Sequence, residues 1–265
     1  TLAGLLPPLG GEVMMEGTPL AELSSRSLAR RRAMLTARDP VPGGISAAEL
    51  VALGRHPHSG WTARLTAEDE TAIDRAFHEA GAQPFRGRVI DELSDGERQR
   101  VSIARLLAQE SSLLLLDEPT AFLDLPARIE LLDTLAGLSR RRGLTIILST
   151  HDLDSALRHA DRILLFDQSR HLHEGAPEDL ALSGVIGQAF DSERIRFDPT
   201  QARFRQTEKS GTPIRVEGDG PAALWTCRAL ERHGWKPVSG KDGDRSSDIP
   251  LVEIDGETKW RISRR

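Results

Sequence analysis

The sequence predicts an α/β fold built on a parallel β-sheet, with a small α+β module near the C-terminus. The four leucines 113–116 form a continuously apolar run, as expected of a strand that is buried on both faces of a parallel sheet. Between residues 93 and 167, segments with helical periodicity alternate with short apolar runs. This alternation is typical of βαβ units, in which helices cover the faces of the sheet.

The first half of the chain predicts a short strand followed by mostly helical structure. Residues 11–17 read as a strand between glycine turns, and residues 23–35 as a helix that leads into a strand at 33–36. From residue 45 to 92 the pattern is mostly helical. Ser46 and Glu49 form a capping-box start for this region.

The second half predicts the strands and helices of the sheet itself. Apolar residues at helical spacing indicate a helix that begins just after Gly96. The elements that follow are a strand at 113–116, a helix at 126–142, a strand at 144–149, a helix at 152–159 and a strand at 162–167.

Composition narrows the classes of function. The net charge of −5 argues against a general affinity for nucleic acid, which needs positive charge to meet phosphates. Cys227 is the only cysteine, so no intrachain disulfide can form, which suits a reducing cytoplasm. The apolar runs are much shorter than the roughly 20 residues of a membrane-spanning helix. We therefore expect membrane contact only through a partner.

A change in composition near Ser192 indicates a second domain, and we place the boundary between 1–191 and 192–265. We expect a β-α-β-β module there, with strands at 213–217, 250–254 and 259–262, a turn at 218–220, a helix at 221–233 and a hairpin turn at 255–256. Its tryptophans at 225, 235 and 260 are expected in a core or interface. Two roles remain open for the module: support of folding or dimerisation, and binding of a regulatory ligand.

Asp117 and Glu118 follow the predicted buried strand 113–116 directly. Ligands of open α/β sheets bind at the carboxyl ends of the strands. A carboxylate at that place can hold Mg²⁺, which in turn bridges nucleotide phosphates, and a second carboxylate can orient an attacking water. The alternative is a strand that simply ends in two solvated acids.

The pentad Leu93-Ser94-Asp95-Gly96-Glu97 allows two interpretations. Ser94 and Glu97 match a capping box, so the pentad can simply start a helix. A helix N-terminus with a glycine also presents free N–H groups to an anion, and Ser94 can donate its hydroxyl to a phosphate oxygen. His151, just past the predicted strand 144–149, is placed to contact a terminal phosphate, although a lone histidine there is more often structural.

The order of these motifs resembles the ATP-binding subunit of ABC transporters. Leu93–Glu97 resembles the family signature, with Asp95 where glycine is more usual, and 113–118 resembles the Walker B strand with its catalytic glutamate. Residues 121–124 are similar to the D-loop, which ends at Asp124, and His151 to the switch histidine. The resemblance covers about residues 1–190 and implies an ABC-type P-loop ATPase domain with a helical subdomain at about 45–108.

The resemblance also implies a phosphate-binding loop, and no Gly-x-x-x-x-Gly-Lys-Ser/Thr motif occurs in the 265 residues. The opening Thr1-Leu-Ala-Gly4 resembles the helix that follows this loop in the family. We expect the chain to lack the segment that carries the motif, and we expect these 265 residues alone to hydrolyse little ATP.

One position departs from the family pattern. The family carries glutamine in its Q-loop, and alignment of the strand at 34–36 places Ala37 there. Alanine ligates nothing. Three alternatives are open. Arg38 or Asp39 takes the place of the glutamine, a water molecule makes the contact that the glutamine would make, or ATP turnover is slow.

A second resemblance concerns the transported substrate. The segment Glu49–His58 resembles the importers of ferric siderophores, haem and vitamin B12. His56 and His58 also suggest a metal site, but the proline-containing turn offers no further ligands and argues against one.

The family resemblance implies roles for the site residues and an assembly. Two ATPase subunits would form a homodimer that binds ATP and Mg²⁺, with Ser94 and Gly96 acting on the ATP held by the partner. Asp117 would hold the metal, Glu118 would polarise water, His151 would contact the γ-phosphate, and Asp124 would link the two sites.

The implied assembly includes two integral-membrane permease subunits docked near residues 37–60, on the cytoplasmic face of the inner or plasma membrane. A substrate-binding protein would deliver an iron chelate, haem or cobalamin. The alternatives are a non-transport ABC ATPase of DNA repair or translation, and a regulatory subunit that binds nucleotide weakly.

Overall fold

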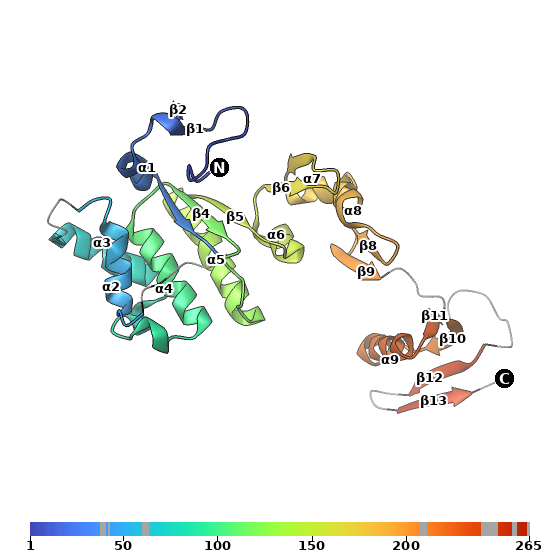
Figure 1. Ribbon diagram of the computed structural model, residues 1–265. Coiled ribbons are helices and arrows are strands. Elements are labelled where there is room, and N and C mark those ends of the chain that lie inside the picture. Colours follow the sequence, from blue (N-terminus) through green and yellow to red (C-terminus); the bar gives the residue numbers. More distant parts are fainter. Residues whose placement is uncertain are drawn as a thin grey trace. The chain divides into compact units, whose positions relative to one another are not determined.

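The computed structural model describes residues 1–37, 41, 43–59, 64–206, 211–239, 249–255 and 259–263. These residues belong to two compact units, Thr1–Ile163 and Leu164–Arg265 (Figure 1). The predicted boundary between residues 191 and 192 stays a prediction. Among the described residues, we find no helix whose length and hydropathy would suit a membrane span.

A three-stranded parallel sheet organises the first unit. Its strands are β3 (Arg32–Leu35), β4 (Leu113–Asp117) and β5 (Thr145–Ser149), in the order β3-β4-β5. Leu35 pairs with Leu116, and Leu116 pairs with Leu148, so the carboxyl ends of all three strands lie at one edge. The central leucines of β4 are buried, which confirms the prediction from the apolar run.

The N-terminal segment adds a hairpin and a helix. β1 (Met14–Met15) pairs antiparallel with β2 (Thr18–Pro19), and η1 (Leu20–Glu22) follows. The sequence predicted one strand here and missed the second, which has only two residues and ends in a proline. Ser24 caps helix α1 (Ser25–Arg31), which leads directly into β3 as predicted.

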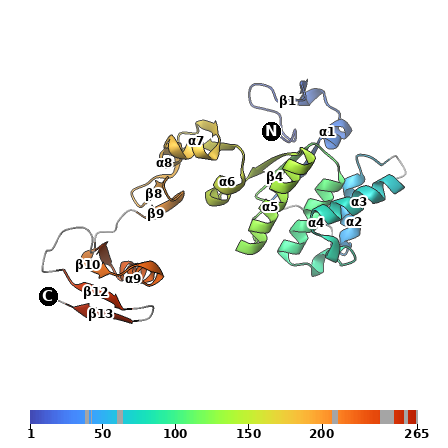
Figure 2. The ribbon, with the colours of Figure 1, turned by 180° about the vertical axis from the view of Figure 1, so that it is seen from behind.

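Four helical segments form a layer beside the sheet. α2 (Ala47–Ala52), with its predicted capping box, and α3 (Ala67–Glu79) both pack on α4 (Asp95–Ala108), and η2 (Leu53–Arg55) continues α2. Figure 2 shows the same grouping of α2, α3 and α4 from behind. The short turns η3 (Gln83–Phe85) and η4 (Ile90–Glu92) lead into α4.

Gly54 permits a close approach between η2 and α4. A Cβ atom at this position would lie 2.2 Å from the backbone oxygen of Arg105. Only glycine fits so near to another backbone.

A buried ion-pair network fastens η2 to its neighbours. The Arg55 side chain is only 3% exposed; its Nε donates to Asp69 Oδ1 at 2.8 Å, and its Nη1 donates to Glu110 Oε2 at 2.7 Å. The Nη1 atom also donates to the carbonyl of Ala108 at 2.7 Å. Arg55 therefore ties the start of α3 to the end of α4, and its charge is compensated by two carboxylates.

Helix α4 begins two residues earlier than the sequence predicted. Ser94 is its N-cap and Gly96 lies in its first turn, because the Ser94–Glu97 capping box sets the start. The last helices of the unit, α5 (Leu125–Arg142) and α6 (Leu153–His159), pack on each other. Gly143, at φ 65°, ends α5 in the left-handed conformation that favours glycine.

The second unit begins with small two-stranded sheets and short helices. β6 (Ile163–Phe166) pairs with β7 (Leu172–Gly175), and the helices α7 (Pro177–Leu182) and α8 (Val185–Phe190) follow. β8 (Ile195–Asp198) and β9 (Arg203–Gln206) form a hairpin in which Phe197 faces Phe204. The ring of Phe204 also packs edge-on against the ring of Phe190, with 5.8 Å between the ring centroids, and this contact joins the hairpin to α8.

A four-stranded sheet with one helix completes the chain. The strands are β10 (Thr212–Glu217), β11 (Trp235–Ser239), β12 (Leu251–Asp255) and β13 (Lys259–Ser263), in the order β11-β10-β12-β13, and α9 (Gly220–Arg232) connects the first two. The β12–β13 hairpin is antiparallel as predicted. The sequence missed β11, which carries Pro237 and forms an edge of the sheet.

The core of this small module is formed by Ile214, Val216 and Val252, with Trp235 packed against it. The expectation for Trp235 is thus confirmed. Trp225 is 60% exposed and so lies outside the core. The side chain of Trp260 lies outside the part of the structure that is described.

Candidate active site at the carboxyl edge of the parallel sheet

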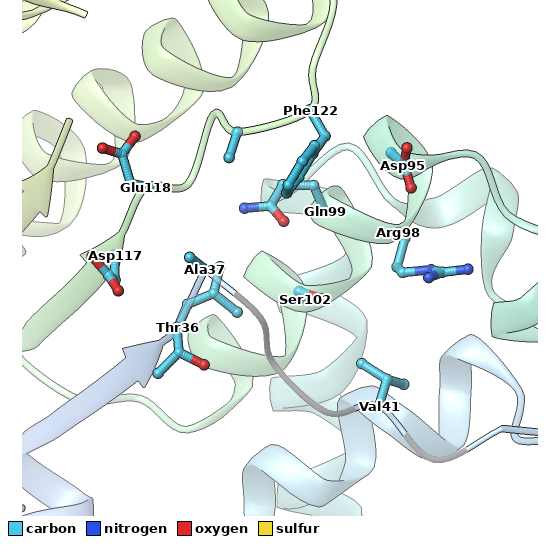
Figure 3. Close-up of a pocket in the computed structure, with 12 residues that line it drawn as sticks. Thr36, Ala37, Val41, Asp95, Arg98, Gln99, Ser102, Asp117, Glu118 and Phe122 are labelled. Atoms are coloured by element: carbon cyan, nitrogen blue, oxygen red, sulfur yellow. The ribbon is translucent and has the colours of Figure 1, made fainter. Parts of the chain in front are cut away.

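A cavity of about 210 Å³ lies where the parallel strands end beside α4 (Figure 3). The predicted site residues Ala37, Asp95, Asp117 and Glu118 all line it. The other residues of its wall come from the end of β3, from the segment between β3 and α2, from α4 and from the loop after β4: Leu35, Thr36, Val41, Arg98, Gln99, Ser102, Ala121 and Phe122. The parallel register brings residues from distant parts of the chain to this edge.

Asp117 is the last residue of β4, and Ser149 is its partner at the end of β5. The Ser149 hydroxyl donates to Asp117 Oδ1 at 2.6 Å and accepts the backbone N–H of Glu118 at 3.0 Å. This pair of bonds fixes one carboxylate oxygen. The carboxylate is exposed, and hard oxygen ligands of this kind are those that Mg²⁺ prefers.

Glu118 stands in an unusual backbone conformation, with φ 48°. Non-glycine residues rarely adopt this left-handed conformation, and such strain concentrates at functional sites. Glu118 Oε1 lies 2.9 Å from Nδ1 of His151, whose ring is 84% exposed. Glu118 Oε2 is buried and has no hydrogen-bond partner among the described residues. A buried acceptor without a partner fits a site for a polar group such as water.

The start of α4 is held by the capping box itself. The Ser94 hydroxyl donates to Glu97 Oε2 at 2.9 Å, and Ser94 Oγ accepts the Glu97 N–H at 3.4 Å. The bond from the Ser94 backbone N–H, the bond from its hydroxyl and the nearby Arg88 guanidinium lower the pKa of Glu97. The exposed Ser94 thus has its hydroxyl proton bound within the chain.

The other signature residues differ in their surroundings. Leu93 is 6% exposed and anchors the signature in the core. A Cβ at Gly96 would meet Ala127 Cβ at 3.7 Å, an ordinary contact, so packing does not require glycine there. A glycine that packing does not demand is available for close approach of a ligand to the backbone.

Asp124 is the N-cap of α5, and its Oδ1 accepts the N–H of Ala127 at 2.9 Å. The preceding loop exposes Phe122, which stands at φ 67°. Asp124 does not line the cavity, so its predicted D-loop role stays a prediction.

Ala37 follows β3 and presents only a methyl group to the cavity (Figure 3). A methyl group offers neither a lone pair nor a hydrogen-bond donor, so this side chain binds no metal or water. Arg38 and Asp39, the alternatives considered from the sequence, lie outside the described residues.

Sequence reasoning missed Gln99 and Ser102, which α4 directs to the same cavity as Asp95. The spacing 95, 99, 102 follows the i, i+4, i+7 rule and places all three on one face of a helix, so this signal was available. The bond from Ser149 to Asp117 was also missed. The pairing of β4 with β5, which brings Ser149 beside Asp117, is a tertiary feature.

His58 has structural surroundings. His58 Nε2 lies 2.9 Å from the backbone oxygen of Gln109. Within the described ranges, no three metal-ligating side chains gather into a metal site.

Comparison with known proteins agrees with this geometry. The family model of ABC transporters matches residues 1–121, and that of the iron ABC transporter C-terminal domain matches residues 210–265. The achromobactin transport ATP-binding protein CbrD of Dickeya dadantii is 38% identical over 200 residues, which cover 75% of this chain and 74% of that protein.

The ferric enterobactin transport ATP-binding protein FepC of Escherichia coli is 36% identical over 216 residues, covering 82% of this chain and 77% of that protein. A solved ABC transporter in an inward-facing conformation has a TM-score of 0.61 at 25% identity, over 71% of this chain and 70% of that one. By sequence, by fold and by the arrangement of its motifs, the chain belongs to the ABC transporter family as an ATP-binding subunit.

Proposed function

We propose that this chain powers the import of a ferric siderophore by hydrolysing ATP at the edge of its parallel sheet. The observation that carries the proposal is the meeting of Asp117, Glu118 and signature helix α4 around one cavity. This arrangement stands in a chain that is 36% and 38% identical to ATP-binding proteins of ferric enterobactin and achromobactin transport. The match of residues 210–265 to an iron ABC transporter domain supports the same cargo.

The site residues have chemically distinct tasks in this proposal. Asp117, oriented by the Ser149 hydroxyl, would hold Mg²⁺, which would supply charge neutralisation to the phosphates. Glu118 orients the attacking water and accepts its proton. His151, which now bonds Glu118, reaches the terminal phosphate from its exposed position.

The signature acts on a second nucleotide in the proposed homodimer. Ser94 and the backbone of Gly96 face the γ-phosphate of ATP that the partner subunit binds, with Leu93, Asp95 and Glu97 holding the signature in place. For this contact the Ser94 hydroxyl has to leave Glu97. A helix N-terminus favours an anion at this place, and Asp124 then connects the two sites.

The transporter further contains two permease subunits, docked near residues 37–60, and a separate substrate-binding protein. The ATPase subunits lie at the cytoplasmic face of the membrane in this assembly. A transporter of known structure resembles this chain in fold, which supports the proposal.

The catalytic assignment is tested with Glu118→Gln in the complete gene product, assembled with its permease. The amide cannot accept the proton, so we expect ATP turnover to fall at least 100-fold, the size of a general-base contribution. ATP binding and the ATP-bound dimer should persist. Glu70→Gln, an exposed change on α3, is the matched control and should leave turnover unchanged. Normal turnover in Glu118→Gln would refute the assignment.

The cargo is tested by uptake in cells with and without the intact gene. We expect deletion to abolish uptake of iron from a labelled ferric siderophore and to spare haem and labelled cobalamin, and the gene on a plasmid should restore iron uptake. Loss of cobalamin or haem uptake alone would assign a different cargo. Normal import of all three would remove the importer proposal.

Ala37 favours a second candidate, a regulatory subunit that binds nucleotide and turns it over slowly. The two candidates differ in steady-state ATPase activity of the assembled transporter. Turnover that does not respond to the substrate-loaded binding protein would support the regulatory subunit.

A further inference from the structure

We infer that Gln99 is a positioning residue for ATP hydrolysis, which holds the turn of Glu118 in place from signature helix α4. The inference rests on the proposed catalytic role of Glu118. It begins from one hydrogen bond. The side-chain amide nitrogen of Gln99 donates to the backbone oxygen of Pro119 at 2.6 Å. Pro119 is almost completely buried, and the bond itself is partly buried at the wall of the cavity.

The turn that receives this bond is strained. Glu118 stands at φ 48° and is followed by a proline. A residue before proline normally adopts an extended conformation, because the proline ring collides with other arrangements of its neighbour. A conformation of this kind persists only where surrounding contacts enforce it. The turn therefore needs external contacts on both of its sides.

Two contacts from different elements supply this restraint. On one side, the N–H of Glu118 donates to the Oγ atom of Ser149, at the end of β5, at 3.0 Å. On the other side, Gln99 binds the carbonyl of Pro119 from α4. Glu118 thus lies between one restraint from the sheet and one from the helix.

The helical restraint connects the catalytic turn to the signature. Gln99 lies five residues after the N-cap Ser94, which corresponds to about 7.5 Å along the helix axis. A displacement of the start of α4 against the sheet is therefore transmitted to Pro119 and Glu118. Among the described residues of the cavity wall, Gln99 is the only one with a side-chain amide (Figure 3).

The test compares two substitutions of Gln99 in the complete gene product assembled with its permease. Gln99→Met keeps an unbranched, neutral side chain of similar length and removes the donor. We expect its kcat for ATP to fall roughly tenfold, the value of one buried hydrogen bond, with KM for ATP within about twofold of wild type. Gln99→Lys keeps a donor on an unbranched chain and should recover part of kcat. Glu70→Gln, an exposed change on α3 that does not touch the cavity wall, should retain kcat.

The outcomes separate the inference from the proposal on which it rests. Wild-type kcat in Gln99→Met would overturn the inference. The kcat of Gln99→Met could also fall together with a lower Tm or a matching rise in KM, without recovery in Gln99→Lys. That result would assign Gln99 a merely structural role and would also overturn the inference. If Glu118→Gln keeps normal turnover, the catalytic assignment itself fails. If Glu118→Gln loses turnover and Gln99→Met keeps the wild-type kcat, the role of Gln99 is refuted and the catalytic assignment of Glu118 stands.

Discussion

The buried Arg55–Asp69 pair offers the sharpest test of how the helical layer is held together. Asp69 Oδ1 accepts from Arg55, and Oδ2 accepts the backbone N–H of Thr66 at 2.9 Å. In Asp69→Asn the single amide oxygen can satisfy only one of these donors, and the amide nitrogen is forced against the other. Loss of one partner of a buried ion pair costs 3–5 kcal/mol, and because Glu110 still compensates Arg55, we expect about 3 kcal/mol.

The pH dependence provides an independent estimate of the charged part of this energy. The backbone bond from Thr66, followed by the bond from Arg55, lowers the pKa of Asp69 from 3.8 to about 2. At 1.36 kcal/mol per pKa unit, this difference is equivalent to about 2 kcal/mol. Because the folded pKa is the lower one, the stabilisation is complete well above pH 4 and is lost as the pH falls towards 2. At pH 3 roughly 1 kcal/mol of it should already be gone.

The assay is thermal unfolding followed by circular dichroism, with hydrogen exchange of α3 and α4 to locate the loss. A destabilisation of about 3 kcal/mol predicts a Tm lower by roughly 6–12 °C at pH 7. The gap between wild type and Asp69→Asn should narrow at pH 3. Asp74→Asn is the control. Asp74 lies on the exposed surface of α3, where it pairs with Arg86, and its substitution should lower the free energy of unfolding by less than about 1 kcal/mol. A gap below 1 kcal/mol at pH 7, or one that stays constant to pH 3, would refute the reasoning.

Three further substitutions test the site and the packing around it. His151→Ala removes the ring that bonds the Glu118 carboxylate and should lower ATP turnover roughly 100-fold while nucleotide binding persists; equal turnover in a steady-state assay would show that the histidine is structural. Ala37→Gln introduces a side-chain amide at the position aligned with the Q-loop glutamine and should raise kcat several-fold; an unchanged kcat would mean that position 37 is not limiting. Gly54→Ala drives a methyl group against the backbone oxygen of Arg105 and should cost about 3 kcal/mol by urea unfolding, whereas Gly10→Ala, in open space, should change little; equal stabilities would contradict the close approach.

Several features of the fold could be predicted because they depend on local patterns. The apolar run of β4, the capping box of Ser46 and the β12–β13 hairpin each follow from a few adjacent residues. Prediction from local sequence patterns failed where tertiary packing overrides the preference of a single residue. No strand was predicted around Pro237 from the sequence, yet β11 forms there at an edge of the sheet, where a missing backbone donor is tolerated.

The candidate site was predicted in part for the same reason. Asp117 and Glu118 follow a recognisable strand, so their place at the sheet edge could be read from the sequence. Gln99 belongs to the wall of the cavity and has no such marker, because its partner Pro119 lies 20 residues away along the chain. The strained φ of Glu118 was equally inaccessible, since contacts from β5 and α4 impose it.

The sequence by itself determined the order of the motifs, the kinds of elements that carry them and the family to which the chain belongs. Periodicity and helix caps depend on residues that are close together in the chain, and the order of the motifs is a property of the chain itself. All three can therefore be recognised without the structure. Only the tertiary structure decided which side chains meet. Ser149 bonds Asp117, His151 bonds Glu118 and Arg55 bonds Asp69, because strand register and helix packing bring together groups that are remote in the chain.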